Sequence, residues 1–276
     1  MAEQKSFASI GVIGCGNMGG ALIRQIANAE QGKKQLFVYD ADTGKAESTA
    51  RACPSRSVEV CASAIDLARK SALIILAVKP QQIQEVLSNM YASGALANKL
   101  VVSIAAGIPL ATLTACAPSI GIIRTMPNTP AQIGSGAIAW TAAASVRENE
   151  KSAFEELFSA CGILFPLEEK LMDAFTALAG SGPAYAFMLM NALAEGGLRE
   201  GLDKASALAM TAQTFLGAAR MVLELGEHPE VLKDRVTSPG GTTAAGLAAL
   251  ETDAVRAACI KAVAAARARA TELGKL

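Results

Sequence analysis

The chain has 276 residues, 25 basic and 25 acidic side chains, six scattered cysteines and one histidine. This neutral balance without a basic stripe argues against nucleic acid as a partner, and the shortage of clustered ligands argues against a metal site. A run of about 18 apolar residues, which a membrane span would need, is absent, and the N-terminus lacks the pattern of a signal peptide. We therefore expect a cytoplasmic protein that binds no metal, nucleic acid or membrane.

The first part of the chain alternates between β-rich runs and helical patterns. Continuous apolar strands separated by helices are typical of a parallel sheet that is covered on both faces. We therefore predict an α/β fold in which residues 1–166 form a Rossmann-type, doubly wound, dinucleotide-binding domain. The expected strands are SIGVIG, LFVYD, VEV, ALIILAV, LVVSIAA, GIIRTM and GAIAW.

After Pro166 the strand pattern ends, and residues 167–276 are predicted to form an all-helical C-terminal domain. Proline just inside the expected helix starts and glycine just past the ends support these assignments. The many alanines and glycines would let helices of two subunits approach closely, although an ordinary monomeric bundle is the alternative. Helices are expected at 168–179, 183–200 and 204–225, with one or two more from 231 to the end.

The motif GCGNMG follows the first expected strand and opens a helical pattern. In this context G-x-G-x-x-G is typical of dinucleotide binding. Its first glycine permits the tight turn, its second lets the backbone approach a pyrophosphate, and its third lets the helix lie close to the sheet. The pyrophosphate would lie at the positive end of that helix. The residues assigned to the cofactor site here are Gly14, Cys15, Gly16, Asn17, Met18 and Gly19.

Asp40 ends the second expected strand, about 20 residues after the glycine motif, where an acidic residue binds the adenosine ribose in NAD-dependent folds. Its carboxylate would repel a 2′-phosphate and so favours NADH over NADPH. Lys45, five residues later in the sequence, would weaken that preference. The alternative is that Asp40 is only a turn residue or helix cap.

Two further strand ends and one turn complete the predicted cofactor site. LAVKP and SIAAG end at the carboxyl edge of the sheet, where ligands of open α/β folds bind. MPNTP is interpreted either as a rigid loop or as part of the site wall, and the lysine of LAVKP either as a ligand contact or as a solvated edge residue. The residues assigned here are Ala77, Val78, Lys79, Pro80, Ala105, Ala106, Gly107 and Asn128.

A second glycine turn, SPGGTT at residues 238–243, opens a helical pattern in the predicted helical domain. A helix N-terminus presents backbone N–H groups to anions, and the adjacent glycines could wrap a small one. Hydroxyl groups at Ser238, Thr242 and Thr243 add further donors. Such a site suits a carboxylate, and a helix start with nothing bound is the alternative.

Together these segments identify a family resemblance. GCGNMG, LAVKP, SIAAG, MPNTP, AGSGPAYAFM and LKDRVTSPGGTTAAGLAALE occur in the order typical of pyrroline-5-carboxylate reductases, and the resemblance covers essentially the whole chain. It implies reduction of the imine 1-pyrroline-5-carboxylate to L-proline with NADPH or NADH, the last step of proline biosynthesis. It also implies a helical substrate-binding and dimerisation domain, and a homodimer or a higher homo-oligomer such as a decamer.

The resemblance further implies roles for single residues. Thr243 would hydrogen-bond near the imine nitrogen and is the catalytic candidate, with positioning as its first role. Asp40 stands where many members carry a small hydroxyl residue, which puts their usual preference for NADPH in question. The implied substrate-binding residues are Glu169, Ser181, Gly182, Ser238, Gly241, Thr242 and Thr243.

Two rival functions remain at this point. The β-hydroxyacid dehydrogenases share the glycine turn and a helical second domain, but they need a lysine as acid and base, and the matching position holds Ala186. A nucleotide-binding protein that has lost its chemistry is the other rival. The intact SPGGTT segment argues against it.

Overall fold

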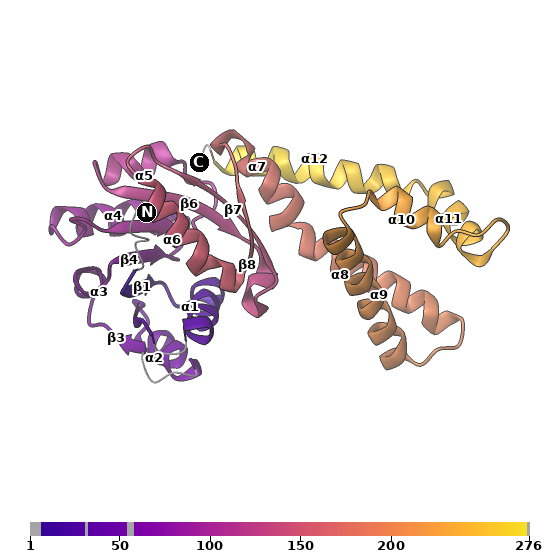
Figure 1. Cartoon of the computed structure of the whole chain (residues 1–276), viewed down its shortest axis with the longest axis horizontal. Coiled ribbons are helices and arrows are strands. Elements are labelled where there is room, and N and C mark those ends of the chain that lie inside the picture. Colours follow the sequence, from indigo (N-terminus) through magenta and orange to yellow (C-terminus); the bar gives the residue numbers. More distant parts are fainter. Residues whose placement is uncertain (1–6, 31–32, 54–57, 275–276) are drawn as a thin grey trace. The chain divides into compact units, whose positions relative to one another are not determined.

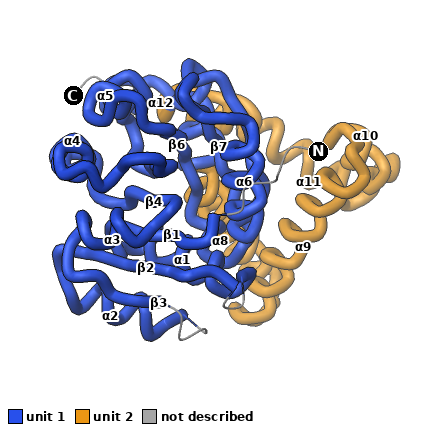
Figure 2. The backbone as a smooth tube through the Cα atoms, turned by 60° about the vertical axis from the view of Figure 1, so that its left-hand side comes forward, with its two compact units in different colours: residues 1–180, 267–276 blue, residues 181–266 orange. Residues whose placement is uncertain are grey.

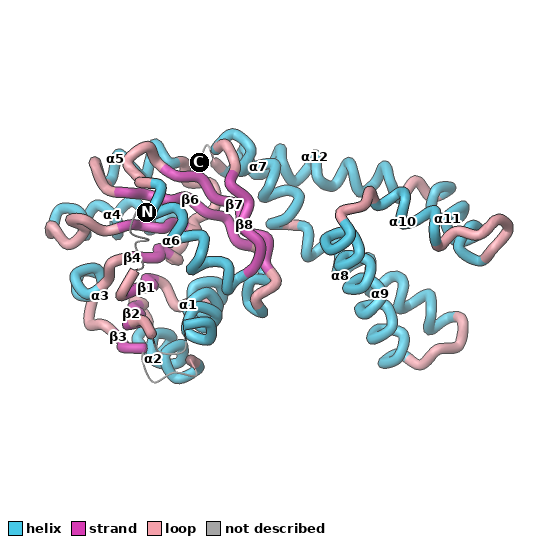
Figure 3. The backbone as a smooth tube through the Cα atoms, viewed as in Figure 1, coloured by secondary structure: helices cyan, strands magenta, loops and turns pink. Residues whose placement is uncertain are grey.

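The computed structural model describes residues 7–30, 33–53 and 58–274. The chain divides into two compact units, one of residues 1–180 and 267–276 and one of residues 181–266 (Figure 2). The strands lie in the first unit, and the second unit is built from helices (Figure 3). The predicted fold class, a Rossmann-type domain followed by a helical region, is confirmed.

The sheet of the described residues has eight strands in the order β3-β2-β1-β4-β5-β6-β7-β8 (Figure 1). The chain moves from β1 to β2 and β3 on one side and to β4 and β5 on the other. The crevice beyond the carboxyl ends of β1 and β4 is therefore a topological switch point, where ligands of such sheets bind. The strands are β1 (Ser9–Ile13), β2 (Gln35–Tyr39), β3 (Val58–Val60), β4 (Leu73–Leu76), β5 (Leu100–Ser103), β6 (Gly121–Pro127), β7 (Gly136–Ala142) and β8 (Gly162–Pro166).

Helices cover both faces of this sheet because strand side chains alternate in direction. Residues from α1 and α6 pack with Ile10 and Val12 on one face, while residues from α3, α4 and α5 pack with Ile13 on the other. The helices of the first unit are α1 (Asn17–Glu30), α2 (Thr43–Ala52), α3 (Ala64–Lys70), α4 (Ile83–Ala92), α5 (Leu110–Cys116), α6 (Glu148–Phe158) and α7 (Met172–Phe175).

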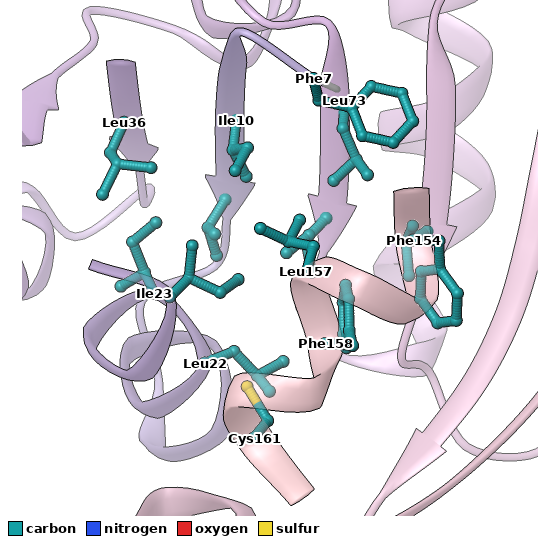
Figure 4. Close-up of a cluster of buried hydrophobic side chains, with 14 of the residues drawn as sticks. Phe7, Ile10, Leu22, Ile23, Leu36, Leu73, Phe154, Leu157, Phe158 and Cys161 are labelled. Carbon is teal, nitrogen blue, oxygen red and sulfur yellow. The ribbon is translucent and has the colours of Figure 1, made fainter. Parts of the chain in front are cut away.

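The core on the α1 face combines aliphatic and aromatic side chains. Figure 4 shows Leu22 and Ile23 of α1 beside Phe158 of α6, beneath the strand that carries Ile10. Phe154 and Phe158 are fully buried, and their ring centroids are 4.5 Å apart. Because burial of a phenylalanine side chain contributes about 1.5–3 kcal/mol, these contacts hold α1 and α6 firmly on the sheet that carries the glycine turn.

The second unit consists of helices, of which α8 and α9 contact each other closely. The long helix α9 ends at Leu225 and is capped by Gly226, the glycine expected just past its end, whose φ of 66° is the left-handed conformation typical of such caps. No helix of the described residues is both long enough and apolar enough to cross a bilayer. The helices are α8 (Gly182–Arg199), α9 (Lys204–Leu225), α10 (Pro229–Arg235), α11 (Thr242–Thr252) and α12 (Val255–Leu273), the last of which ends in the first unit.

Three details of the predicted elements are wrong. The strand β8 was not predicted, because GILFP is short and half exposed at the sheet edge and shows no alternation. The strands β6 and β7 pair antiparallel instead of parallel. Only residues 128–135, with the short helix Thr129–Ile133, link them, which is too short for the crossover that a parallel pair needs. From Pro229 onward the described residues form three helices, where one or two were expected from residue 231.

The units also divide at a different place from the predicted boundary between residues 166 and 167. The segment 169–180 stays with the sheet, since the Asn128 side chain donates to the Ala179 carbonyl and the Arg124 guanidinium pairs with Glu169. The end of α12 returns to the same unit, where the Thr271 hydroxyl donates to Asp173. These long-range contacts carry no signature in the local sequence.

Candidate functional site

The turn between β1 and α1 shows what each glycine of GCGNMG does. Gly14 has a φ of 99°, and a Cβ there would lie 2.6 Å from the Ala77 carbonyl. A Cβ on Gly19 would lie 2.0 Å from the Gly14 oxygen. A Cβ on Gly16 would meet no protein atom within 4 Å. The fold therefore requires the first and third glycines, while the second faces open space that fits a pyrophosphate at the start of α1.

Asp40 is tied to this turn. Its carboxylate accepts hydrogen bonds from the backbone N–H of Cys15 at 2.7 Å and from the backbone N–H of Asp42 at 2.9 Å. The side chain of Asp42 in turn caps α2 by accepting from the Lys45 N–H. Asp40 therefore does act as a turn residue, as the alternative interpretation held, and its contact with a ribose stays a prediction.

A cavity of about 590 Å³ opens beyond the ends of β1, β2 and β4. Its size lies in the range of small-molecule and cofactor sites. Its walls include predicted cofactor residues, namely Gly14, Gly16, Asp40, Ala77, Val78 and Lys79, together with Tyr39, Ser63 and Ile65, which were not predicted. Ser63 and Ile65 follow the short strand β3, whose sequence VEV carries no motif that indicates a site.

A second cavity, of about 470 Å³, lies within the same unit. Pro80, Ala106 and Gly107 line it, together with Asp173 and Thr176 from the segment after the sheet. Gly107 has a φ of 77°, so this bend after β5 favours glycine. The structure thus brings the LAVKP and SIAAG strand ends to the carboxyl edge of one sheet. Ala105 is buried beneath this edge, with 4% of its surface exposed.

Two predicted site residues have internal partners. Asn128 is buried, its amide donates to the Ala179 carbonyl, and its side-chain oxygen accepts from the Ala137 N–H. The Glu169 carboxylate accepts from the Leu110 N–H at 2.6 Å and pairs with Arg124 at 2.8 Å. These contacts give both residues a structural role in the first unit, and their ligand contacts stay predictions.

The SPGGTT turn lies at the start of α11 in the second unit. Gly240 has a φ of 66°, which favours glycine, whereas a Cβ on Gly241 would lie 2.3 Å from the Ser238 hydroxyl, which can rotate away. Gly241 caps α11 without a side-chain hydrogen bond. Within the described part of the chain, the hydroxyls of Ser238, Thr242 and Thr243 have no protein partner. The first N–H groups of an 11-residue helix and three hydroxyls are thus free for an anion.

The remaining predicted substrate residues, Ser181 and Gly182, begin α8 in the second unit. No hydrogen bond joins them to the SPGGTT turn among the described residues. Glu169 belongs to the first unit. The predicted substrate residues therefore belong to three separate segments of the sequence, of which the SPGGTT turn offers the most free donors.

Two buried cysteines of the first unit, Cys15 and Cys161, are poor nucleophiles. Burial and the nearby Asp40 charge raise the pKa of the Cys15 thiol to about 12, and burial raises the pKa of Cys161 to about 12. Both thiols are therefore neutral and unreactive near neutral pH. Among the described residues, no three His, Cys, Asp or Glu side chains lie together as metal ligands would.

Comparison with known proteins decides the family. The profile described as pyrroline-5-carboxylate reductase dimerisation matches residues 169–273, and one described as NADP oxidoreductase, coenzyme F420-dependent, matches residues 9–107. A pyrroline-5-carboxylate reductase of Synechocystis is 40% identical over 96% of this chain and 98% of its own length. The Escherichia coli enzyme of that name is 37% identical over the same shares. The chain belongs to the pyrroline-5-carboxylate reductase family.

Solved structures of reductases in this family agree with the observed fold. The structure from Coxiella burnetii has a TM-score of 0.87 at 34% identity, with 98% of this chain and 99% of that chain covered. The structure from Plasmodium falciparum, which has NADP bound, has a TM-score of 0.82 at 32% identity, with 97% and 98% covered. The two profiles cover different glycine turns: the NADP oxidoreductase profile spans GCGNMG, and the reductase dimerisation profile spans SPGGTT.

The three glycines of GCGNMG give a test that separates folding from binding. Gly19→Ala should lower the free energy of unfolding by about 1–3 kcal/mol, because the new methyl group overlaps the Gly14 backbone. Gly16→Ala should change it by less than about 0.5 kcal/mol, because nothing in the protein opposes the methyl group. Denaturant unfolding measures both values. If both variants lost the same free energy of unfolding, the assignment of Gly19 to folding and of Gly16 to binding would be wrong.

Proposed function

We propose that this protein reduces 1-pyrroline-5-carboxylate to L-proline with NADPH or NADH as the hydride donor. The observation that carries the proposal is the presence of two different glycine turns, each at a helix N-terminus. One leaves open space at Gly16 for a pyrophosphate, and the other offers free N–H groups and hydroxyls at α11 for a carboxylate. The Synechocystis and Escherichia coli relatives, which match almost the whole chain, are named for this reaction.

The chemistry fits the groups that are present. Reduction of a C=N bond needs a hydride donor, a hold on the substrate carboxylate and a proton on the ring nitrogen, but neither a metal nor a nucleophile. A nicotinamide cofactor, when bound, would supply the hydride. Because the imine nitrogen can take its proton from water and the resulting iminium is already electrophilic, the protein's contribution is orientation and electrostatic positioning.

The substrate half of the site is assigned to the SPGGTT turn. Backbone N–H groups of Gly241 to Thr243 bind the carboxylate, with Ser238 and Thr242 as further donors. The Thr243 hydroxyl orients the ring nitrogen so that the imine carbon faces the hydride. A threonine hydroxyl is a poor acid, so Thr243 acts by positioning, while Glu169, Ser181 and Gly182 are proposed as further substrate contacts.

The helical second unit is proposed as the substrate-binding and dimerisation domain. In the single chain its helices expose large apolar side chains, such as Phe187 at 63% and Met188 at 65% on α8 and Leu208 at 50% and Leu216 at 54% on α9. Exposed apolar surface of this kind marks protein interfaces. We propose a homodimer formed through this unit, and a larger homo-oligomer such as a decamer is the alternative. The six free cysteines suit a reducing compartment, so a cytoplasmic location is proposed.

The reaction itself is tested by initial rates with the imine and each cofactor. We expect oxidation of NADPH or NADH that depends on 1-pyrroline-5-carboxylate and yields proline in equal amount. Thr243→Ala should lower kcat/KM for the imine by roughly 10- to 1000-fold, as for the loss of one preorganised hydrogen bond. Nucleotide affinity should stay the same.

Thr252→Ala is the matched control, because that hydroxyl lies at the other end of α11 and bonds only to the Ala248 carbonyl. It should leave the kinetics unchanged. If Thr243→Ala weakened nucleotide binding and left the imine kinetics unchanged, the two turns would have been assigned to the wrong ligands.

Assembly is tested by light scattering on dilute protein. The native chain should be at least a dimer, and Phe187→Asp should shift it toward smaller species because a charge would be buried in the interface. Ile133→Asp is the control, since Ile133 is exposed to 76% but lies in the first unit. A fully active monomer would refute the proposed dimer.

The choice of cofactor is tested at Asp40. Asp40→Asn keeps the shape of the side chain and removes the charge that opposes a 2′-phosphate. The ratio of kcat/KM for NADPH to that for NADH should rise by about fivefold, since two unit charges about 4 Å apart in water repel by about 1 kcal/mol. An unchanged ratio would mean that the carboxylate serves only the turn.

A further inference from the structure

A small pocket of about 250 Å³ lies beside the glycine turn, between α1 and α2. Gly16 and Lys45 line both this pocket and the larger cavity beyond the ends of β1 and β2, so the two are adjacent. The side chains that line the small pocket are chiefly Asn17, Arg24, Lys45, Ser48 and Thr49. The sequence analysis gave no role to Arg24, Ser48 or Thr49.

Arg24 is the unusual member of this group. It lies two helical turns after Asn17, on the same face of α1, and it is only half exposed. Its guanidinium lies across Gly20, because a Cβ on that glycine would be 3.2 Å from Nη1 of Arg24 and 3.2 Å from the Thr49 hydroxyl. In the part of the chain that the structure describes, no carboxylate lies within ion-pair distance of Arg24. A half-buried arginine without an acidic partner points to an anionic ligand.

The other charges around the pocket leave it positive. Lys45 has a long contact with Asp42, 3.7 Å between Nζ and Oδ2, and both side chains are more than half exposed, so this pair is weak. The Asp40 carboxylate is held by the N–H groups of Cys15 and Asp42, and it lines the larger cavity but not this pocket. The Cys53 thiol, which the Arg24 charge affects, stays neutral because burial raises its pKa.

Two cations and two hydroxyls in a pocket of this size suit a phosphate monoester. The larger cavity contains the residues predicted to bind the adenosine half of the cofactor, and a phosphate on the adenosine ribose would enter the small pocket where Gly16 and Lys45 join the two. We propose that Arg24 and Lys45 bind the 2′-phosphate of NADPH, and that this pocket offsets the repulsion from Asp40. The inference rests on the proposed function for the identity of the dinucleotide.

The test is the dissociation constant of each reduced cofactor, measured by fluorescence without any imine. Arg24→Gln should raise the dissociation constant of NADPH by about 10- to 100-fold, the equivalent of losing one hydrogen bond to a charged group. Lys45→Gln should also raise it. NADH affinity should change by less than about twofold in both variants, which also shows that the glycine turn is still folded.

Arg51→Gln is the matched control for net charge, because Arg51 also lies on α2 but pairs with Glu47 and does not line the pocket. It should leave both affinities unchanged. Adenosine 2′,5′-bisphosphate and 5′-AMP serve as minimal probes, and only the first should lose affinity in Arg24→Gln.

The proposal would be overturned if Arg24→Gln lost affinity for NADPH and NADH equally, or lost affinity for neither. Because the binding is measured without imine, its outcome is independent of the reduction. A protein that bound NADPH through Arg24 but reduced no imine would refute the proposed function and keep this site. If the protein reduced the imine but Arg24→Gln left the choice of cofactor unchanged, the proposed function would stand and the phosphate site would be refuted.

Discussion

The close contact between the start of α1 and the end of β1 is the constraint on which the nucleotide half of the site depends. A Cβ on Gly19 would overlap the Gly14 oxygen, and a Cβ on Gly14 would overlap the Ala77 carbonyl at the end of β4. With both side chains missing, α1 begins directly at the sheet edge and its first N–H groups face the switch-point crevice. The same contact fixes the position of the Cys15 N–H, which Asp40 binds.

The core on the α1 face holds this geometry in place. Leu22, Ile23 and Ile26 of α1 are fully buried against the strands, so the turn has little freedom to shift. Such rigidity suits a reaction in which the protein mainly orients two ligands. By contrast, the SPGGTT turn belongs to a unit with little buried surface of its own, and a second subunit would supply the packing that a single chain lacks.

Much of the first unit could be predicted from the sequence. Buried parallel strands are continuous apolar runs such as LIIL of β4, and a glycine motif between strand and helix has few other uses. What could not be predicted depends on contacts between distant residues. The edge strand β8 has no pattern of its own, and the segment 169–180 joins the sheet through Asn128 and Arg124, which are about 50 residues away in the chain.

In the candidate site, too, features carried by the local sequence could be predicted, and features that depend on distant contacts could not. Motif residues such as Gly16 and Thr243 could be identified because their type and spacing carry the chemistry. The hydrogen bonds that Asp40 accepts from two backbone N–H groups could not be identified from the sequence, and neither could the pocket that holds Arg24. Both depend on elements that approach each other only in the folded chain. Arg24 does share a helix face with Asn17, but a spacing of two turns on one helix is equally common among solvated arginines.

The central claim is that a nicotinamide bound at the first turn delivers its hydride to an imine held at the second. The most direct measurement is the mass of the proline formed from 1-pyrroline-5-carboxylate and a reduced cofactor that carries deuterium on both positions of its C4 carbon. We expect each proline to gain one deuterium, bound to the former imine carbon. Proline without deuterium, in a reaction that still consumes the cofactor, would contradict it.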